Sequence, residues 1–313
     1  MDKVTVRSLR ESELGEADRI MRLAFGTFLG LPDPTAFMGD ADYVRSRFAA
    51  DPTAALAAEI DGRLVGTNFV NRWGSVGFFG PLTVLPELWD RGVARRLLDA
   101  TMPIFDEWAV THRGLFTFPQ STKHLSLYQR YGFLPRFLTA VMAKPAGPDP
   151  GATGWTPLSG MTDPEVALAA CSELTGQIYP GFEVEREIWA AERQKLGDTV
   201  VVHGLAGALD GFAVCHSGPG TEAGSGVCFI KFGAARPGPD AGDRFGRLVE
   251  ACEAFAISQG ASVVVAGVNT ARRGAYRALL DRGFRAEMIG VAMHNADDEG
   301  YHHPDAWVID DWR

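Results

Sequence analysis

A strand, a glycine-containing turn and a helix follow one another at residues 78–100, and this unit constrains the fold most. Residues 78–84 form an apolar run that contains Thr and Val and stops before Pro86, which predicts a short strand. Leu97 and Leu98 lie on the apolar side of the helix that follows. A strand that feeds directly into an amphipathic helix indicates an α/β fold.

The turn between them has the composition of a phosphate site. Gly92 and Ala94 let a ligand approach the backbone, and Arg91, Arg95 and Arg96 add positive charge. A helix N-terminus also presents unpaired N–H groups and the positive end of the helix dipole. Two common phosphate motifs, G-x-x-x-x-G-K-[ST] and G-x-G-x-x-G after a strand, are absent. The turn therefore predicts a different kind of phosphate site, with an ordinary strand-turn-helix as the alternative.

This unit resembles the coenzyme A motif of the GNAT acetyltransferase superfamily, in which V-x-P is followed by [QR]-x-x-G-x-[GA]. The matching segments are 84–86 and 89–94, with Trp89 where the family usually has Gln or Arg. The resemblance implies acetyl-CoA as the acyl donor, with its pantetheine arm on the strand and its pyrophosphate on the turn. The implied binding residues are Leu82, Thr83, Val84, Asp90, Arg91, Gly92, Val93, Ala94 and Arg95.

A second segment, 121–133, resembles the GNAT pattern N-x-x-A-x-x-L-Y-x-x-x-G-F. By this resemblance Tyr128 protonates the departing thiolate, which is chemically sound because a phenol of pKa ~10 is protonated at neutral pH. His124 lies one helical turn earlier and could relay a proton from the acceptor. A core aromatic for Tyr128 and a surface histidine for His124 remain the alternatives. The positions that match are Leu127, Tyr128, Gly132 and Phe133, and those that differ are Ser121 and His124.

The order of strands and helices occurs twice along the 313 residues. Hairpins are predicted at 54–70 and, around Asp210-Gly211, at 199–216, and a Pro/Gly-rich linker at 143–154 separates the copies. The expected fold class is α/β with two tandem GNAT-like domains, each a mixed twisted sheet flanked by helices. Their expected bounds are 1–145 for a catalytic domain that binds acyl-CoA and 155–313 for a degenerate copy.

The second copy lacks the residues that carry the chemistry. Its strand-to-helix turn, 235–243, contains two prolines and two aspartates and no G-x-[GA]. Leu279 stands at the position equivalent to Tyr128. We therefore predict a structural or substrate-shaping role for this copy, while residual acyl-CoA binding stays open.

Charge and composition narrow the function further. The first 150 residues carry as many basic as acidic side chains, so the net charge of −9 lies in the remainder. This balance disfavours nucleic-acid binding and suits a polyanionic ligand in the first copy. Neither a long apolar run nor a leader is present, so we expect a cytoplasmic protein, monomer or homodimer, without a membrane partner.

The cysteines and the C-terminal histidines are assigned no function. Cys171, Cys215, Cys228 and Cys252 lack C-x-x-C spacing and are predicted to be buried thiols. His302-His303, in an acidic tail near Asp305, is predicted to be exposed rather than a metal site, and no metal is expected.

The pattern as a whole predicts an N-acetyltransferase that acts on a small-molecule primary amine. G-x-S-x-G is absent, which agrees with direct attack of the amine on the thioester without a covalent enzyme intermediate. Where many GNAT enzymes carry a Glu base, this chain has Phe116 and Phe118, so water, a backbone carbonyl, His124 or a loop carboxylate remain candidate bases. A non-catalytic acyl-CoA-binding or sensor protein is the alternative. The aromatic-rich segment 25–37 suggests an apolar component in the acceptor.

Overall fold

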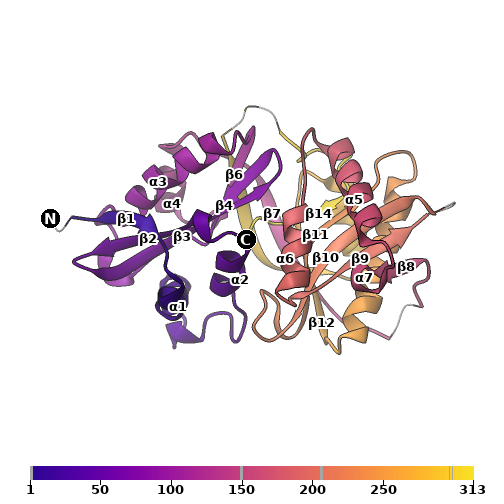
Figure 1. Ribbon diagram of the computed structural model, residues 1–313, viewed down its shortest axis with the longest axis horizontal. Coiled ribbons are helices and arrows are strands. Elements are labelled where there is room, and N and C mark those ends of the chain that lie inside the picture. Colours follow the sequence, from indigo (N-terminus) through magenta and orange to yellow (C-terminus); the bar gives the residue numbers. More distant parts are fainter. Residues whose placement is uncertain (1–2, 149–150, 205–206, 296, 298) are drawn as a thin grey trace.

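The computed structural model describes residues 3–148, 151–204, 207–295, 297 and 299–313. Two halves, residues 3–145 and 155–313, lie side by side and share one twisted sheet (Figure 1). Helices cover the sheet in each half, as the mixed α/β prediction requires. The GNAT-like α/β fold class is confirmed.

The elements of the first half follow the predicted order. They are β1 (Thr5–Ser8), α1 (Leu14–Phe28), α2 (Val44–Ala50), β2 (Ala55–Ile60), β3 (Arg63–Trp73), β4 (Val76–Phe79), β5 (Thr83–Val84), α3 (Val93–Glu107), β6 (His112–Thr117), α4 (Thr122–Gln129) and β7 (Leu134–Pro145).

The second half follows much the same order and ends with an additional short strand. Its elements are β8 (Trp155–Pro157), α5 (Pro164–Ile178), α6 (Glu185–Arg193), β9 (Gly197–His203), β10 (Leu209–Gly218), β11 (Gly224–Ala235), α7 (Ala241–Ser258), β12 (Val263–Asn269), α8 (Arg273–Asp281), β13 (Arg285–His294) and β14 (Val308–Ile309).

The two halves exchange their last long strands. The sheet runs β1-β2-β3-β4-β6-β13-β7-β12-β11-β10-β9-β8, so β13 of the second half lies between β6 and β7 of the first. In turn, β7 pairs antiparallel with β12 of the second half. Figure 1 shows yellow β13 reaching across the middle of the molecule toward β6. Because backbone ladders cross the junction in both directions, the halves cannot separate without breaking sheet hydrogen bonds.

The predicted strand 78–84 is two strands with different partners. β4 pairs in parallel with β6 only as far as Phe79 and Leu115, whereas β5 pairs with β3. Between them the chain passes through Gly80, with φ 146°, and a cis peptide bond before Pro81. This break opens the sheet into a V between β5 and β6.

Three further predictions are wrong in detail. Asp210 lies in β10 and not in a turn, because it forms ion pairs with Arg244 (3.2 Å) and Arg247. The predicted linker begins too early, since residues 143–145 continue β7 beside β12; residues 149–150 of the linker lie outside the described part. His302 is buried, with its Nδ1 3.0 Å from an Arg272 nitrogen.

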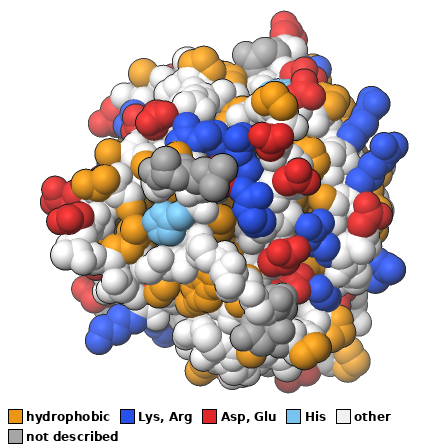
Figure 2. Space-filling view, turned by 90° about the vertical axis from the view of Figure 1, so that its right-hand side faces the viewer, with side chains coloured by type: hydrophobic (Ala, Val, Ile, Leu, Met, Phe, Trp, Pro, Cys, Tyr) orange, Lys and Arg blue, Asp and Glu red, His pale blue; other side chains and the backbone are white. Residues whose placement is uncertain are grey.

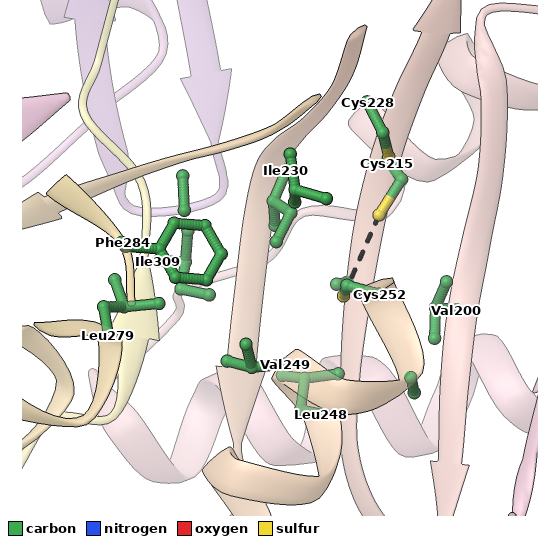
Figure 3. Packing of buried hydrophobic residues seen from close by; sticks show 14 of the residues in the cluster. Val200, Cys215, Cys228, Ile230, Leu248, Val249, Cys252, Leu279, Phe284 and Ile309 are labelled. Carbon is green, nitrogen blue, oxygen red and sulfur yellow. Dashed lines mark hydrogen bonds between the residues drawn. The ribbon is translucent and has the colours of Figure 1, made fainter. Parts of the chain in front are cut away.

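The largest core of the second half lies between its sheet and helices α7 and α8. Figure 3 shows Cys215, Cys228 and Cys252 packed among aliphatic side chains, with the Sγ atoms of Cys215 and Cys252 4.0 Å apart. All four cysteines are buried free thiols, as predicted. Burial raises the pKa of Cys171 to about 12, so this thiol is unreactive at neutral pH.

The surface and the helices give two further observations. Figure 2 shows the end of the second half, where acidic side chains lie among basic ones, so the negative charge of this half does not form one patch on that face. Within the described residues, every helix is too short or too polar to cross a bilayer.

Candidate active site

A cavity of about 680 Å³ fills the V in the sheet of the first half. One wall is the segment 79–84, and the opposite wall is 116–118 at the end of β6. The N-terminus of α3, one face of α4 and the C-terminal part of α1 complete it. β5 pairs through one edge with β3, so its other edge faces the cavity.

The N-terminus of α3 opens into this cavity. Gly92 caps the helix in the left-handed region with φ 80°, where a side chain is disfavoured. A Cβ added there would find no atom within 4 Å, so the space beside the backbone is open. Because α3 begins at Val93, the N–H groups of Val93, Ala94 and Arg95 have no carbonyl one turn earlier in the helix. This arrangement is able to bind an anion.

The predicted donor-binding residues lie around the cavity with one exception. Those that line it are Leu82, Thr83, Val84, Asp90, Gly92, Val93, Ala94 and Arg95. Arg91 is exposed and does not line it. Asp90 forms an ion pair with Lys123 of α4 at 2.6 Å, which ties the turn to that helix.

Trp89, the departure from the GNAT pattern, has a structural role. Its indole Nε1 donates a hydrogen bond to the Val84 carbonyl at 2.9 Å and so fastens the turn to β5. The ammonium of Lys123 lies 5.8 Å from its ring centroid. Trp89 also lines the cavity. Spacing alone did not reveal this role, because it depends on how the turn folds back.

Tyr128 projects from α4 into the inner part of the cavity. It is 7% exposed, and its ring centroid lies 5.7 Å from that of Phe79. Burial holds the pKa of Tyr128 well above its usual range, although a hydrogen bond with the Thr117 side chain opposes the shift. The phenol is therefore protonated at neutral pH and able to donate a proton.

His124 lies one turn before Tyr128 on the same face of α4. The two ring centroids are 6.5 Å apart, and both residues line the cavity. Burial, and then the charge of Lys123, lower the pKa of His124. The imidazole is therefore uncharged at neutral pH and able to accept a proton. It is half-buried beside Phe28, so a freely exposed surface position is excluded.

The carboxylates of the segment between α1 and α2 stabilise turns and contacts. Asp33 accepts from the Thr35 N–H, and Asp42 accepts from the Arg45 N–H at the start of α2. Asp40 accepts from the Ser225 N–H at 2.8 Å, across the junction between the halves. None of the three lines the cavity.

The second half contributes residues that the sequence did not suggest. Met288 of β13 and, from the C-terminal segment, Trp312 and Arg313 line the cavity. Figure 1 marks the C-terminus in the middle of the molecule, between the halves. Gly114 of β6 makes room for this segment, because a Cβ there would come 2.1 Å from the Trp312 ring. No motif signals a contact between residues this far apart in sequence.

A buried ion cluster holds the junction beside the cavity. Glu222 accepts from Arg47 Nε at 2.9 Å and from Lys231 Nζ at 2.6 Å. Arg47 also donates to the carbonyls of Gly80 and Arg313. Burial disfavours the Glu222 carboxylate, yet Arg47 and Lys231 hold its pKa well below the usual range. The cluster thus links the sheet break at Gly80 to the second half.

The equivalent V in the second half is filled by the chain itself. β11 pairs with β12 as far as Ile230 and Ala266, and beyond that point β14 pairs with β11 at Gly233 and Ala234. At the start of α7, a Cβ on Gly242 would lie 3.1 Å from the Trp307 ring. Leu279 is fully buried in the core shown in Figure 3.

The sequence profile described as "Acetyltransferase (GNAT) family" matches residues 19–133. No curated protein sequence matches the chain. Solved structures share its fold. An acetyltransferase structure from Pyrococcus horikoshii has a TM-score of 0.70 and 13% identity, and covers 99% of this chain and 95% of its own.

Two further structures, both of GCN5-related N-acetyltransferases, share the fold of this chain. The Sphaerobacter thermophilus protein has a TM-score of 0.62 and 18% identity and covers 94% of this chain and 96% of its own. The Kribbella flavida protein has a TM-score of 0.52 and 15% identity and covers 94% of this chain and 71% of its own. Residues 19–133 thus belong to the GNAT acetyltransferase family, and the solved structures share the fold of nearly the whole chain.

Proposed function

We propose that this protein transfers an acyl group, acetyl in the simplest case, from acyl-CoA to the primary amine of a small molecule. One observation carries the proposal. A single cavity joins the open edge of β5, the free N–H groups of α3 and the buried phenol of Tyr128. The pantetheine arm of acyl-CoA needs the strand edge, and its pyrophosphate needs the free N–H groups. The leaving thiolate needs the phenol as a proton donor.

The reaction follows from these groups. The neutral amine attacks the thioester carbonyl, a C–N bond forms and the C–S bond breaks. Tyr128 donates its proton to the departing thiolate, and the amine gives up one proton as the amide forms. His124, uncharged at neutral pH and close to Tyr128, takes up that proton, and its transfer back to the Tyr128 phenolate through solvent restores both side chains. Amine and acyl-CoA thereby yield amide and free CoA thiol.

We assign the donor site to the first half, with expected bounds 1–145, and a substrate-shaping role to 155–313. Two features support this division. Met288, Trp312 and Arg313 reach the cavity from the second half, and β14 fills the second half's own V. The cytoplasmic location and the monomeric or homodimeric state stay predictions.

The test is calorimetric titration of acetyl-CoA combined with thiol release on a panel of amines. Gly92→Trp should abolish binding, because the indole would cover the free N–H groups of α3. Gly62→Trp is the matched control, since Gly62 is also exposed, has the same φ of 80° and lies in the β2–β3 turn away from the cavity. Equal loss in both variants would mean that backbone strain, not site blockage, weakens binding. Acetyl-CoA binding without turnover of any amine would overturn the proposed reaction.

A further inference from the structure

The part of the cavity that the donor motifs do not explain is walled by aromatic rings. Phe25 and Phe28 of α1, Phe37 of the following segment and Phe118 after β6 line it, and we name these four residues the aromatic chamber. Phe25 and Phe37 stack with centroids 5.2 Å apart, and Phe28 lies 5.0 Å from Phe118. The chamber adjoins the proton-transfer groups, because the His124 ring lies 5.2 Å from Phe28.

Further apolar side chains line the same cavity. Met38 and Leu29 line it from the first half, and Met288 and Trp312 line it from the second. Methionine side chains adapt to the shape of an apolar ligand. Three of the four chamber rings are half-buried and Phe118 is almost fully buried, so an apolar ligand would remove ring surface from water.

Charges in the cavity are placed to disfavour a polycation. Among the described lining residues, Asp90 is the one carboxylate side chain, and it is already paired with Lys123 at the α3 turn. Arg313 of the second half also lines the cavity, and its Nε donates to Asp311 at 2.8 Å. A second ammonium on the acceptor would therefore lose its hydration without meeting an unpaired carboxylate side chain.

We propose that the acceptor is a monoamine with a flat apolar body, an aromatic ring in the simplest case, that is held in the aromatic chamber while its amine faces the thioester. This inference rests on the proposed acyl transfer and defines its acceptor class. Binding comes from burial of the ring, whereas polyamines and other polycations are excluded. The second half takes part in this choice through Met288 and Trp312.

The experiment compares matched amines as acceptors of acetyl-CoA. Ethylamine and 2-phenylethylamine differ by one ring, and butylamine and 1,4-diaminobutane differ by one ammonium. Burying a ring of this size should raise kcat/KM by about ten- to a hundredfold for 2-phenylethylamine over ethylamine, mainly through KM. Diaminobutane should be a poorer substrate than butylamine.

Phe37→Ala should remove about tenfold of the ring advantage, measured as the ratio of kcat/KM for 2-phenylethylamine to kcat/KM for ethylamine. Phe37 is a suitable site because it lies outside the regular helices and strands. Phe48→Ala is the matched control, since Phe48 is also half-buried in the first half but does not line the cavity. It should leave the ring advantage unaltered.

Several outcomes would overturn the inference while acyl transfer stands. These are equal kcat/KM for ethylamine and 2-phenylethylamine, preference for diaminobutane, or a ring advantage that survives Phe37→Ala. Phe37→Ala could instead shift the donor preference from octanoyl-CoA toward acetyl-CoA and leave the amine preference unchanged. That result would assign the chamber to the acyl chain of the donor. If no amine is turned over, the proposed function fails, and calorimetry of 2-phenylethylamine against ethylamine on the CoA-bound protein still decides the acceptor class.

Discussion

The buried carboxylate of Glu222 is expected to be a main determinant of stability at the junction. Its side chain is 2% exposed, and those of its partners Arg47 and Lys231 are 3% and 6% exposed. Glu222→Gln keeps the volume but leaves two cations buried without their shared counter-ion. Removing one partner of a buried ion pair costs about 3–5 kcal/mol, a large share of the roughly 5–15 kcal/mol that stabilises a domain.

The assay is equilibrium urea denaturation, with thermal unfolding in parallel. The expected loss of free energy corresponds to a Tm lower by roughly 5–8 °C for a chain of this size. Glu87→Gln is the matched control, because its ion pair with Arg63 is 3.4 Å long and both side chains are more than half exposed. Exposed pairs contribute about 0–1 kcal/mol, so the control should unfold nearly as the wild type does.

The pH dependence gives an independent check. Because the folded-state pKa of Glu222 lies below its unfolded value of about 4.3, its stabilisation is fully present above that pH and is lost as the pH falls toward the folded pKa. The difference between wild type and Glu222→Gln should therefore narrow below pH ~4.3. A Glu222→Gln loss no larger than that of Glu87→Gln, or a difference independent of pH, would refute the reasoning.

Three predictions concern the active site. Tyr128→Phe should lower kcat about 10²-fold, in thiol-release assays, and leave the calorimetric Kd of acetyl-CoA unchanged, because only the thiolate acid is lost; an unchanged kcat would exclude that role. Since burial lowers the pKa of His124, kcat at saturating amine should fall only below the ordinary imidazole range, pH ~6.5, and His124→Gln should remove this acid limb of the profile; a limb in kcat that persists in the variant would exclude His124 as the base. Calorimetry should give one acetyl-CoA per chain because β14 fills the second V, whereas two sites would show that β14 is displaced.

Local sequence patterns predicted the turn before α3 and the helix α4, both of which line the cavity. The turn that opens α3 and the helix that carries Tyr128 each depend on residues within a few positions of one another, namely Gly92 at a left-handed helix cap and Ser121 at the cap of α4. Backbone sterics and capping act over this range, so the spacing is visible in the chain. The break of the strand at Gly80 was missed, because the run of apolar residues continues through it.

The part of the cavity that the second half supplies was outside the reach of such patterns. Its wall includes Met288 and Trp312, which arrive through the exchange of β7 and β13 and through the C-terminal segment. His302 was expected at the surface, yet it is buried beside Arg272. Polar residues in a Pro- and Asp-rich tail indicate exposure only when nothing packs over them.

The sequence by itself determined the α/β class, the repeated order of elements, the buried cysteines and the residues of the α3 turn and α4, because these depend on short-range periodicity, caps and composition. The tertiary structure alone decided which strands pair across the junction, that β14 fills the second V, and that Glu222 joins Arg47 from far away in the chain. Such contacts are selected by shape and charge complementarity between distant surfaces, which leaves no periodic trace along the chain.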